Sequence, residues 1–381
     1  MKKIAVIGAG ISGLFIANLF KRNKKYQVTI FEKNSSINLK EGYGIQLSVN
    51  SIKLLNKIQF DKLENNEKFN PDKINFYSVK NSRKICELNI SDFNTENCKY
   101  TTLKRSSLIN FLKKDLEKEI KFDHTISKIE QQDQIIKITF KNNKIYECDY
   151  LIISDGVFSK SKNLLSKNQI ETKFNDTLVI RGILPSSSNI ADKKNISLFL
   201  GPNFHYVIYP VTPDGDLNFI AVMKFKLSKD QQKDYSLFND DIFIKKVLEK
   251  VPHIDKKFFD NIEDLKIYPV FISYDFFEVK NTNIHLIGDA FFTFPPSFAQ
   301  GASQSIEGAY QLFDNIRNNT ESNFFKKRVD KTKMVNNRSK FNQFAFHLSN
   351  PLTTLLRNIF LKRLVKNKKF LESYLGKIYK N

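Results

Sequence analysis

The hydrophobic pattern at the start of the chain predicts a β-α-β unit. Residues 3–7 form an almost unbroken apolar run, which is typical of a strand buried on both faces. Apolar residues then recur at helical spacing over residues 14–20, and a second apolar run follows at 28–31. Two strands joined by one helix predict neighbouring parallel strands, and therefore an α/β fold.

The rest of the chain reads as further strands and helices. Strands are expected at 73–90, 126–140, 144–153, 179–183, 197–200, 206–211, 218–225 and 284–287. Helices are expected at 102–120, 240–251, 301–313 and over most of 323–380, and residues 42–58 read as a glycine-bearing loop followed by a helix. The Pro-Asp-Gly triplet at 213–215 predicts a hairpin turn between two strands of an antiparallel sheet.

Composition narrows the class of protein. The 61 Lys and Arg residues outnumber 40 acids, but most are spread along the chain without any nucleic-acid-binding motif, so we expect no nucleic-acid partner. The exception is residues 325–381, which contain 15 basic residues and only two acidic ones. Three separated cysteines and five scattered histidines predict neither a disulfide framework nor a metal site. The absence of a leader pattern or a long apolar run favours a cytoplasmic protein.

The turn between the first strand and helix carries the first chemical signal. Gly8, Gly10 and Gly13 form a G-x-G-x-x-G pattern, and Glu32 closes the second strand. This order predicts a dinucleotide site: the glycines allow a tight turn near the pyrophosphate, and the helix N-terminus attracts it. Glu32 is suited to ribose hydroxyls and would repel a 2′-phosphate, so NADP is not expected in this site.

A second signal lies some 280 residues later. The buried run at 284–287 ends in Gly288 and Asp289, a proline-bearing loop follows, and a helix is expected to start near Gly301. A carboxylate suits the hydroxyls of a polyol chain, and a helix N-terminus suits a ring that becomes anionic on reduction. Together with the N-terminal turn, this pattern points to a flavin dinucleotide.

With these motifs in order, the chain resembles the single-component FAD-dependent aromatic monooxygenases, the family of p-hydroxybenzoate and salicylate hydroxylases. The resemblance covers about residues 1–360 and includes the Asp-Gly segment at 155–159. Smaller matches at 42–47, 181–182, 201–211 and 299–302 favour the salicylate-hydroxylase-like branch. The chain departs from the family where arginine usually stands at Lys162, and where a histidine usually follows the Gly-Asp motif at Phe292.

The resemblance implies a Rossmann-type FAD-binding domain interleaved with a β-sheet substrate domain. We expect residues 1–70, 100–170 and 280–320 in the first, 71–99 and 171–279 in the second, and 321–381 as a basic helical region. The residues assigned to FAD are Gly8, Gly10, Ser12, Gly13, Glu32, Lys33, Arg105, Asp155, Asp289, Gly301 and Ala302.

The family reaction is implied in the same way. NADH or NADPH reduces FAD, O2 adds to give a C4a-hydroperoxyflavin, and one oxygen passes to a small phenolic substrate. No second nucleotide turn is readable, which agrees with a nicotinamide that docks transiently. Candidates for substrate contact are His205, Tyr209, Arg181 and Tyr43, for each of which an ordinary structural role is the alternative.

Two alternatives stay open. Apolar residues share one helical face at 352–364 with basic residues among and after them, which favours either a packed terminal helix or contact with the inner face of a membrane. The membrane reading would suit a ring hydroxylase of ubiquinone biosynthesis, a relative of the same family. The departures at Lys162 and Phe292 also leave open an FAD-binding redox protein without oxygenase activity.

Overall fold

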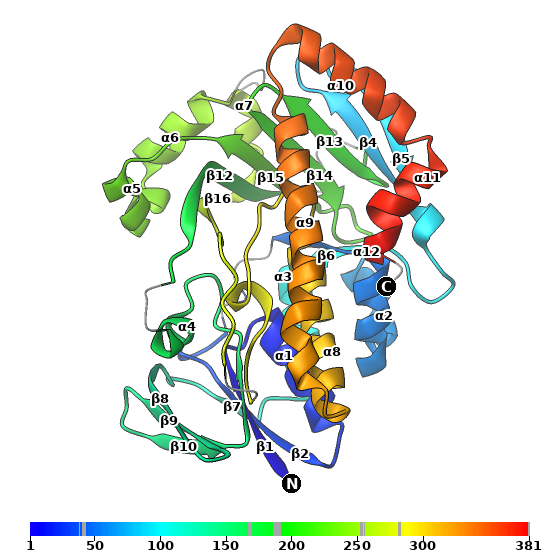
Figure 1. Cartoon of the computed structure of the whole chain (residues 1–381). Helices are drawn as coiled ribbons and strands as arrows, with labels where there is room; N and C mark the ends of the chain where they lie inside the picture. Colours follow the sequence, from blue (N-terminus) through cyan, green and yellow to red (C-terminus); the bar gives the residue numbers. More distant parts are fainter. Residues whose placement is uncertain are drawn as a thin grey trace.

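The computed structural model describes residues 1–37, 39, 43–166, 170–185, 192–251, 254, 256–280 and 283–379; Gly42, part of one family match, lies outside them. A five-stranded, fully parallel sheet forms the N-terminal layer (Figure 1). Its order is β17 (Ile284–Leu286), β11 (Tyr150–Ile153), β1 (Lys2–Ile7), β2 (Tyr26–Phe31) and β7 (Ile120–Lys121). The strands thus come from four separate parts of the chain.

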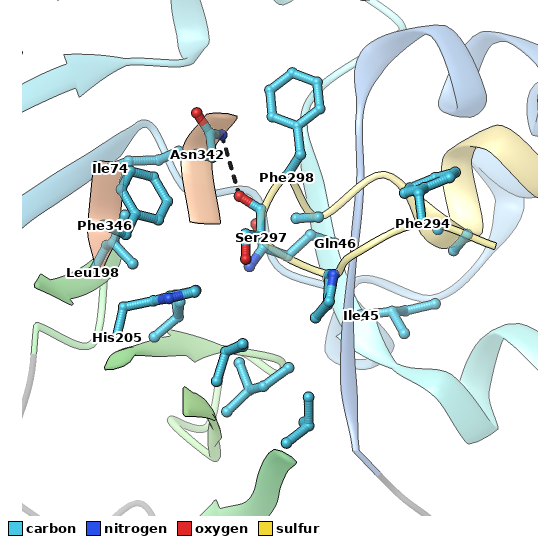
Figure 2. Close-up of a pocket in the computed structure, with 18 of the residues that line it drawn as sticks. Ile45, Gln46, Ile74, Leu198, His205, Phe294, Ser297, Phe298, Asn342 and Phe346 are labelled. Carbon is cyan, nitrogen blue, oxygen red and sulfur yellow. Dashed lines mark hydrogen bonds between the residues drawn. The ribbon is translucent and has the colours of Figure 1, made fainter. Parts of the chain in front are cut away.

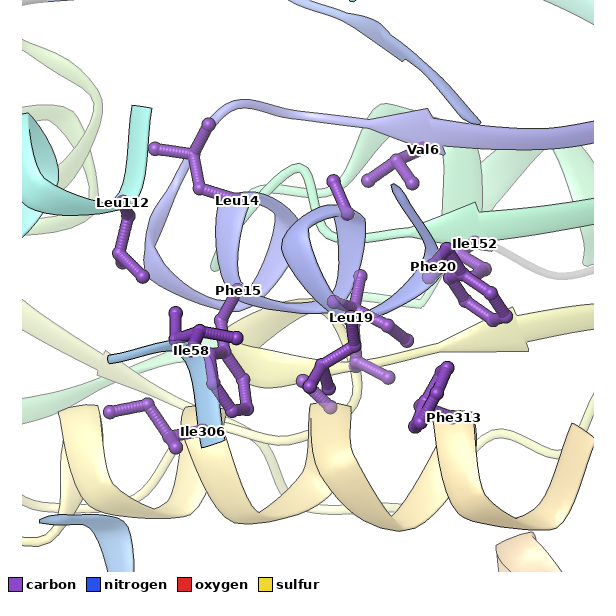
Figure 3. Close-up of a cluster of buried hydrophobic side chains, with 14 of the residues drawn as sticks. Val6, Leu14, Phe15, Leu19, Phe20, Ile58, Leu112, Ile152, Ile306 and Phe313 are labelled. Carbon is purple, nitrogen blue, oxygen red and sulfur yellow. The ribbon is translucent and has the colours of Figure 1, made fainter. Parts of the chain in front are cut away.

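Alternation along β1 explains what covers each face of this sheet. Ile4 and Val6 pack into a core with α1 (Ile11–Lys21), α3 (Arg105–Lys113) and α8 (Gly301–Arg317), shown in Figure 3. Ala5 and Ile7 point to the opposite face, where they meet a small antiparallel sheet. Because both faces are covered, the strands read as continuous apolar runs.

The small sheet corrects two predictions. The single strand expected at 126–140 is a hairpin of β8 (Ile126–Gln132) and β9 (Ile135–Phe140), with Asp133 in the left-handed region at φ 55°. The strand expected at 144–153 is β10 (Ile145–Cys148) and β11, which belong to different sheets. The change of sheet occurs at Asp149, between the two strands: Ile145 of β10 is exposed, whereas every residue of β11 is buried.

A seven-stranded mixed sheet forms the second layer. Its order is β16 (Glu263–Ile272), β12 (Lys173–Leu184), β15 (Leu217–Lys224), β14 (Phe204–Pro210), β13 (Ile196–Gly201), β4 (Lys73–Ser78) and β5 (Lys84–Asn89). Only the β13–β4 pair is parallel among these described strands. The expected antiparallel strands and the turn at 213–215 are confirmed.

Two neighbouring residues of β13 show how the second sheet is covered. Phe199 packs with the helical segment that contains α5 (Lys229–Lys233), α6 (Asp241–Glu249) and α7 (Lys256–Phe259). Leu198 faces the opposite side, where it belongs to a core with Val335 of the C-terminal region and with Leu375, Ile378 and Tyr379 near the end of the chain. That second face borders the cavity described below.

A two-stranded ribbon joins the two layers. It consists of β3 (Gly44–Leu47), where a loop was expected, and β6 (Thr101–Lys104), where a helix was expected. The N–H of Gly44 donates to the Asn218 side chain at 2.6 Å, and the Thr102 hydroxyl donates to the Pro210 carbonyl at 2.6 Å. These bonds fix the ribbon, which leads into α2 (Val49–Leu55) and α3, to the adjoining ends of the central strands β14 and β15. The expected helix at 102–120 is therefore only α3.

The C-terminal region is helical, as predicted. It contains α9 (Phe324–Phe346), α10 (Pro351–Leu364), α11 (Lys368–Leu371), a π-helical turn (Glu372–Gly376) and α12 (Lys377–Tyr379). Figure 1 shows α9 running from the α8 end to the second sheet, and the Gln343 side chain donates to the Thr177 hydroxyl of β12 at 2.9 Å. Within the described ranges, no helix is long and apolar enough to cross a bilayer.

Candidate flavin and substrate site

The N-terminal glycine turn needs glycine for two different reasons. Gly8 has φ +101°, and a Cβ there would lie 2.6 Å from the Ser154 carbonyl oxygen. A Cβ at Gly13 would lie 2.1 Å from the Gly8 carbonyl oxygen, so helix and strand approach closely. Gly10 differs, because a Cβ would meet nothing within 4 Å and the residue lines the cavity. The turn therefore presents the first N–H groups of α1 to open space.

Glu32 supports this turn from the end of β2. One carboxylate oxygen accepts the Ala9 N–H at 2.9 Å, and the other accepts the Asn34 N–H at 3.1 Å. The acid thus lies beside the glycine turn, as the spacing predicts, while Lys33 next to it is exposed. Their contact with a nucleotide stays a prediction.

Asp289 follows β17 and faces the cavity, inside the short helical turn Gly288–Ala290. Its side chain is exposed to solvent and lines the cavity. Desolvation raises the pKa of Asp289 to about 6, and the positive charge of Arg105 opposes that rise. A Cβ at Gly288 would lie 2.5 Å from the Ser12 hydroxyl, so the β17 end touches the start of α1. Residues 276 positions apart, Ser12 and Gly288, therefore belong to one site.

Arg105 is the first residue of α3. Its N–H donates to the Tyr43 carbonyl at 2.8 Å, and its side chain lines the cavity. The N-terminus of α8 borders the same space at Gly301 and Ala302, where a Cβ on Gly301 would meet nothing within 4 Å. Neither α1 nor α8 has an acid in its first turn, so both N-termini favour a negative ligand.

The Asp-Gly segment lies beyond β11. One Asp155 oxygen accepts the Ser161 N–H at 3.1 Å, while the other is buried with no protein hydrogen bond. Gly156, at φ +86°, lines the cavity. Lys162, which replaces the usual arginine, is buried; desolvation lowers the pKa of Lys162 and the charge of Asp155 opposes this. The lysine is thus packed behind the segment.

Several of these features border a cavity of about 1250 Å³ that also reaches the seven-stranded sheet, and Figure 2 shows part of its wall. Of the residues predicted to bind FAD, Gly10, Ser12, Arg105, Asp289, Gly301 and Ala302 line it. Gly8, Gly13, Glu32, Lys33 and Asp155 lie outside the lining. The remainder of the wall is mostly aliphatic and aromatic.

All four predicted substrate-contact residues also line the cavity. The Tyr43 hydroxyl donates to the Asp264 carbonyl at 3.1 Å, and the Arg181 guanidinium lies 5.8 Å from the centre of the Tyr43 ring. Tyr209 is buried, and desolvation raises its pKa, although Arg181 opposes the shift. Tyr209 is therefore a neutral hydrogen-bonding group rather than a ready base.

His205 belongs to a pair that the sequence does not indicate. Its Nδ1 lies 2.9 Å from Nε2 of His347, which follows the last residue of α9. Burial holds the pKa of His205 well below its usual range, and His347 adds to this effect. A neutral imidazole at the cavity wall accepts or donates a hydrogen bond, but it is a weak base.

Other wall residues were missed because no local motif marks them. The Gln46 side chain accepts the Tyr100 hydroxyl at 2.7 Å, and the Asn342 amide donates to the Ser297 carbonyl at 3.2 Å (Figure 2). The phenylalanines that follow Asp289 fall into two groups. Phe294 and Phe298 line the cavity, whereas Phe291 and Phe292 pack in the core behind it.

Comparison with known proteins agrees with this geometry. Residues 1–321 match the family described as "FAD binding domain", and the chain belongs to that family. It is 24% identical over 225 residues to 3-amino-4-hydroxybenzoate 2-monooxygenase of Streptomyces cremeus, covering 58% of this chain and 56% of that protein. It is 20% identical over 325 residues to 6-hydroxynicotinate 3-monooxygenase of Bordetella bronchiseptica, covering 81% of each. The alignment with the first of these relatives thus spans about half of its length.

Solved structures show the same fold over nearly the whole chain. Klebsiella pneumoniae HpxO complexed with FAD and uric acid superposes with a TM-score of 0.85 at 15% identity, covering 98% of this chain and 97% of that one. A salicylate hydroxylase substrate complex has a TM-score of 0.79 at 17% identity, covering 100% and 95%. The predicted fold class, family and FAD cofactor are confirmed, and the relatives are monooxygenases, as the sequence predicted.

The residues fit FAD on structural grounds as well. Three glycines, Gly10, Gly156 and Gly301, leave open space where a side chain would project. Two helix N-termini and the Arg105 guanidinium supply positive potential, and the Asp289 carboxylate at the cavity wall can accept hydrogen bonds from hydroxyl groups. These groups would hold the phosphates, the flavin ring and the ribityl chain that joins them.

Proposed function

We propose that the protein is an FAD-dependent monooxygenase that hydroxylates an aromatic, phenolic substrate. The balanced reaction consumes one substrate C–H, one O2, one NADH or NADPH and one proton, and yields the hydroxylated product, NAD(P)⁺ and water. The observation that carries the proposal is the shared cavity. One wall has Asp289 and the α8 N-terminus, and the opposite wall is an apolar sheet face.

When bound, FAD supplies the redox chemistry and activates oxygen. The protein's own residues would then orient the ring and exclude water. The α8 N-terminus at Gly301 would stabilise negative charge on the flavin, and the apolar wall would keep water from the reacting carbon. Tyr209 and His205 are the proposed hydrogen-bond partners of the substrate hydroxyl. Arg181 is the proposed partner of a further electron-rich group on the substrate.

The test is substrate-stimulated NAD(P)H oxidation by FAD-loaded protein under ¹⁸O2. A panel of phenols and hydroxybenzoates is screened, and products are examined by mass spectrometry. The proposal requires at least one compound that both accelerates NAD(P)H oxidation and gains one ¹⁸O atom. Stimulated oxidation that releases only hydrogen peroxide, or no stimulation across the panel, favours the redox protein without oxygenase activity.

A second proposal concerns the C-terminal region, which we infer to contact an anionic membrane surface. No residue of α10 is buried, and an apolar row of Leu352, Leu355, Leu356, Ile359 and Phe360 is exposed. The exposed basic residues that follow are Lys362, Arg363, Lys366, Lys368 and Lys369. An exposed apolar row with a basic flank complements the interface of an anionic bilayer.

Vesicle flotation tests this contact. We expect binding to vesicles containing phosphatidylglycerol, and weaker binding to phosphatidylcholine alone at moderate salt. Ile359→Glu should reduce binding at least fivefold, because it puts an acid in the apolar row. Ile242→Glu, an equally apolar exposed position on α6, is the matched control. Equal loss in both variants, or no binding by the unmodified protein, contradicts the proposal.

A further inference from the structure

The cavity extends well beyond the flavin-facing wall. Its volume of about 1250 Å³ includes the space that FAD would fill beside Asp289 and Gly301. The lining continues from the sheet to the C-terminal helices, through Leu356, Phe360, Leu361, Leu364, Val365, Phe370 and Leu371. We call this part, between the seven-stranded sheet and α9–α11, the apolar chamber.

One row of cross-strand neighbours forms the floor of the apolar chamber. The register pairs Arg181 with Ile220, Ile220 with Val207, Val207 with Leu198, and Leu198 with Phe76. All five residues line the cavity. Four strand spacings separate the first residue from the last, which is about 19 Å at ~4.8 Å per strand. The row thus begins at one cation and continues as four apolar side chains.

The cation marks the flavin end of this row. Arg181 lies against the Tyr43 ring, the Tyr43 carbonyl accepts the Arg105 N–H, and Arg105 acts electrostatically on Asp289. The apolar chamber therefore leads away from the flavin-facing wall. A molecule whose aromatic ring lies near Arg181 has room for a long apolar substituent along the row.

Charge is scarce in the apolar chamber. Among the described lining residues beyond Arg181, the charged side chain is Arg357. Its guanidinium donates to the carbonyls of Ala345 and Phe346, at 3.4 and 3.3 Å, and to the Asn358 side chain. Arg357 is thereby hydrogen-bonded to the end of α9, so among the described residues that line the apolar chamber no cation is left to bind a carboxylate.

The mouth of the apolar chamber lies under the exposed apolar row. Phe341, Phe344, Leu356 and Phe360 line the cavity, yet they are 55%, 67%, 45% and 56% exposed. A side chain that is both a wall residue and half exposed marks an opening. Entry there would pass only apolar side chains of α9 and α10, which admits a lipophilic molecule.

We propose that the substrate is a lipophilic phenol with a long alkyl-type chain, which enters beneath α10 and fills the apolar chamber. This substrate class rests on the proposed hydroxylation of a phenol. It differs from a small hydroxybenzoate, because the chain supplies the binding energy and no carboxylate is bound. Burial of each methylene should tighten binding about threefold to fourfold until the chamber is filled.

Titration of FAD-loaded protein, without turnover, tests directly whether the alkyl chain of the ligand contributes to binding. Phenol, 4-butylphenol, 4-octylphenol and 4-hydroxybenzoate are titrated below their micelle concentrations, without NAD(P)H, and the absorbance change of the oxidised flavin gives Kd. We expect octylphenol to bind at least 100-fold more tightly than phenol, and 4-hydroxybenzoate to bind no more tightly than phenol. A Kd that does not depend on chain length overturns the proposal.

Substitutions of two adjacent leucines test where the alkyl chain of the ligand lies. Leu356→Lys puts a charge at the mouth and should weaken octylphenol binding at least fivefold without affecting phenol. Leu355→Lys is the matched control, because Leu355 is exposed on the same helix but does not line the cavity. Flavin content and circular dichroism verify folding. Equal effects of both variants on octylphenol contradict a chain under α10.

The same titrations separate this proposal from the proposed function. Chain-dependent binding without stimulated NAD(P)H oxidation or ¹⁸O incorporation retains the apolar chamber but rejects the monooxygenase. Hydroxylation of phenol and hydroxybenzoate with no chain dependence retains the monooxygenase but rejects the lipophilic substrate.

Discussion

His205 and His347 form a hydrogen-bonded imidazole pair between β14 and the end of α9. Their ring nitrogens are 2.9 Å apart, although 142 residues separate them in the sequence. Burial and the charge of Lys224 together lower the pKa of His347 to about 4, although a hydrogen bond to the backbone of Val222 opposes the shift. The pair is therefore neutral at pH 7, and it fixes α9 to the sheet that forms the cavity floor.

This pair predicts a loss of stability in mild acid. The unfolded chain takes up a proton on each histidine near pH 6.5, whereas the folded chain resists until about pH 4 for His347. Stability is thus fully present above pH 6.5 and falls as the pH decreases, by about 2 kcal/mol at pH 5 for one histidine. Urea denaturation at pH 7 and pH 5 measures the difference.

His347→Gln should reduce that pH dependence, because glutamine retains hydrogen bonding but does not titrate in this range. His124→Gln removes a histidine that packs against Phe31 and Phe140, far from the pair, and serves as the control. If His347→Gln retains the full loss of stability between pH 7 and pH 5, the pair is not its source.

We predict that the Asp289 carboxyl lowers the stability of the apoprotein but increases its affinity for FAD. Its pKa is raised above the unfolded value of 3.8, so the unfolded chain loses its proton first as the pH rises. The carboxyl therefore destabilises the apoprotein increasingly between about pH 4 and pH 6. Asp289→Asn should raise the apoprotein's Tm at pH 7, and should weaken FAD binding at least tenfold by loss of a charged acceptor.

Calorimetric titration of apoprotein with FAD and thermal melts without FAD measure the two effects separately. Asp275→Asn, an exposed acid on the preceding loop, is the matched control and should change neither. Wild-type FAD affinity in the Asp289→Asn variant would refute the role assigned to this carboxylate.

Alanine substitution should separate the structural role of Gly8 from the proposed ligand-binding role of Gly10. Gly8→Ala forces a Cβ to within 2.6 Å of the Ser154 carbonyl at φ +101°, so it should cost about 1–3 kcal/mol of folding stability. Gly10→Ala meets no protein atom within 4 Å and should leave the apoprotein's Tm unchanged. Its methyl group projects toward the cavity, so FAD affinity should fall. Melting curves and FAD titration distinguish the variants, and an unstable Gly10→Ala apoprotein contradicts this division.

The sequence revealed the parts of the site that consist of contiguous residues. The glycine turn with Glu32, and the Gly288–Asp289 pair with Gly301, follow local patterns of strand, turn and helix, so their convergence was predictable. The His205–His347 pair and the row from Arg181 to Phe76 were not. Those depend on sheet register and on how α9 and α10 pack, which are long-range features that no short motif specifies.

A buried charge cluster between α8 and α9 yields the last prediction. The Arg328 guanidinium donates to the Gln304 carbonyl and lies 3.5 Å from a Glu307 oxygen, with both side chains largely buried. Removing one partner leaves the other charge desolvated, so Glu307→Gln should destabilise the protein by about 3–5 kcal/mol. Asp314→Asn, which breaks the surface pair with Arg317 on the same helix, should cost less than about 1 kcal/mol. Urea denaturation compares them, and equal costs would show that burial of the cluster does not determine its contribution.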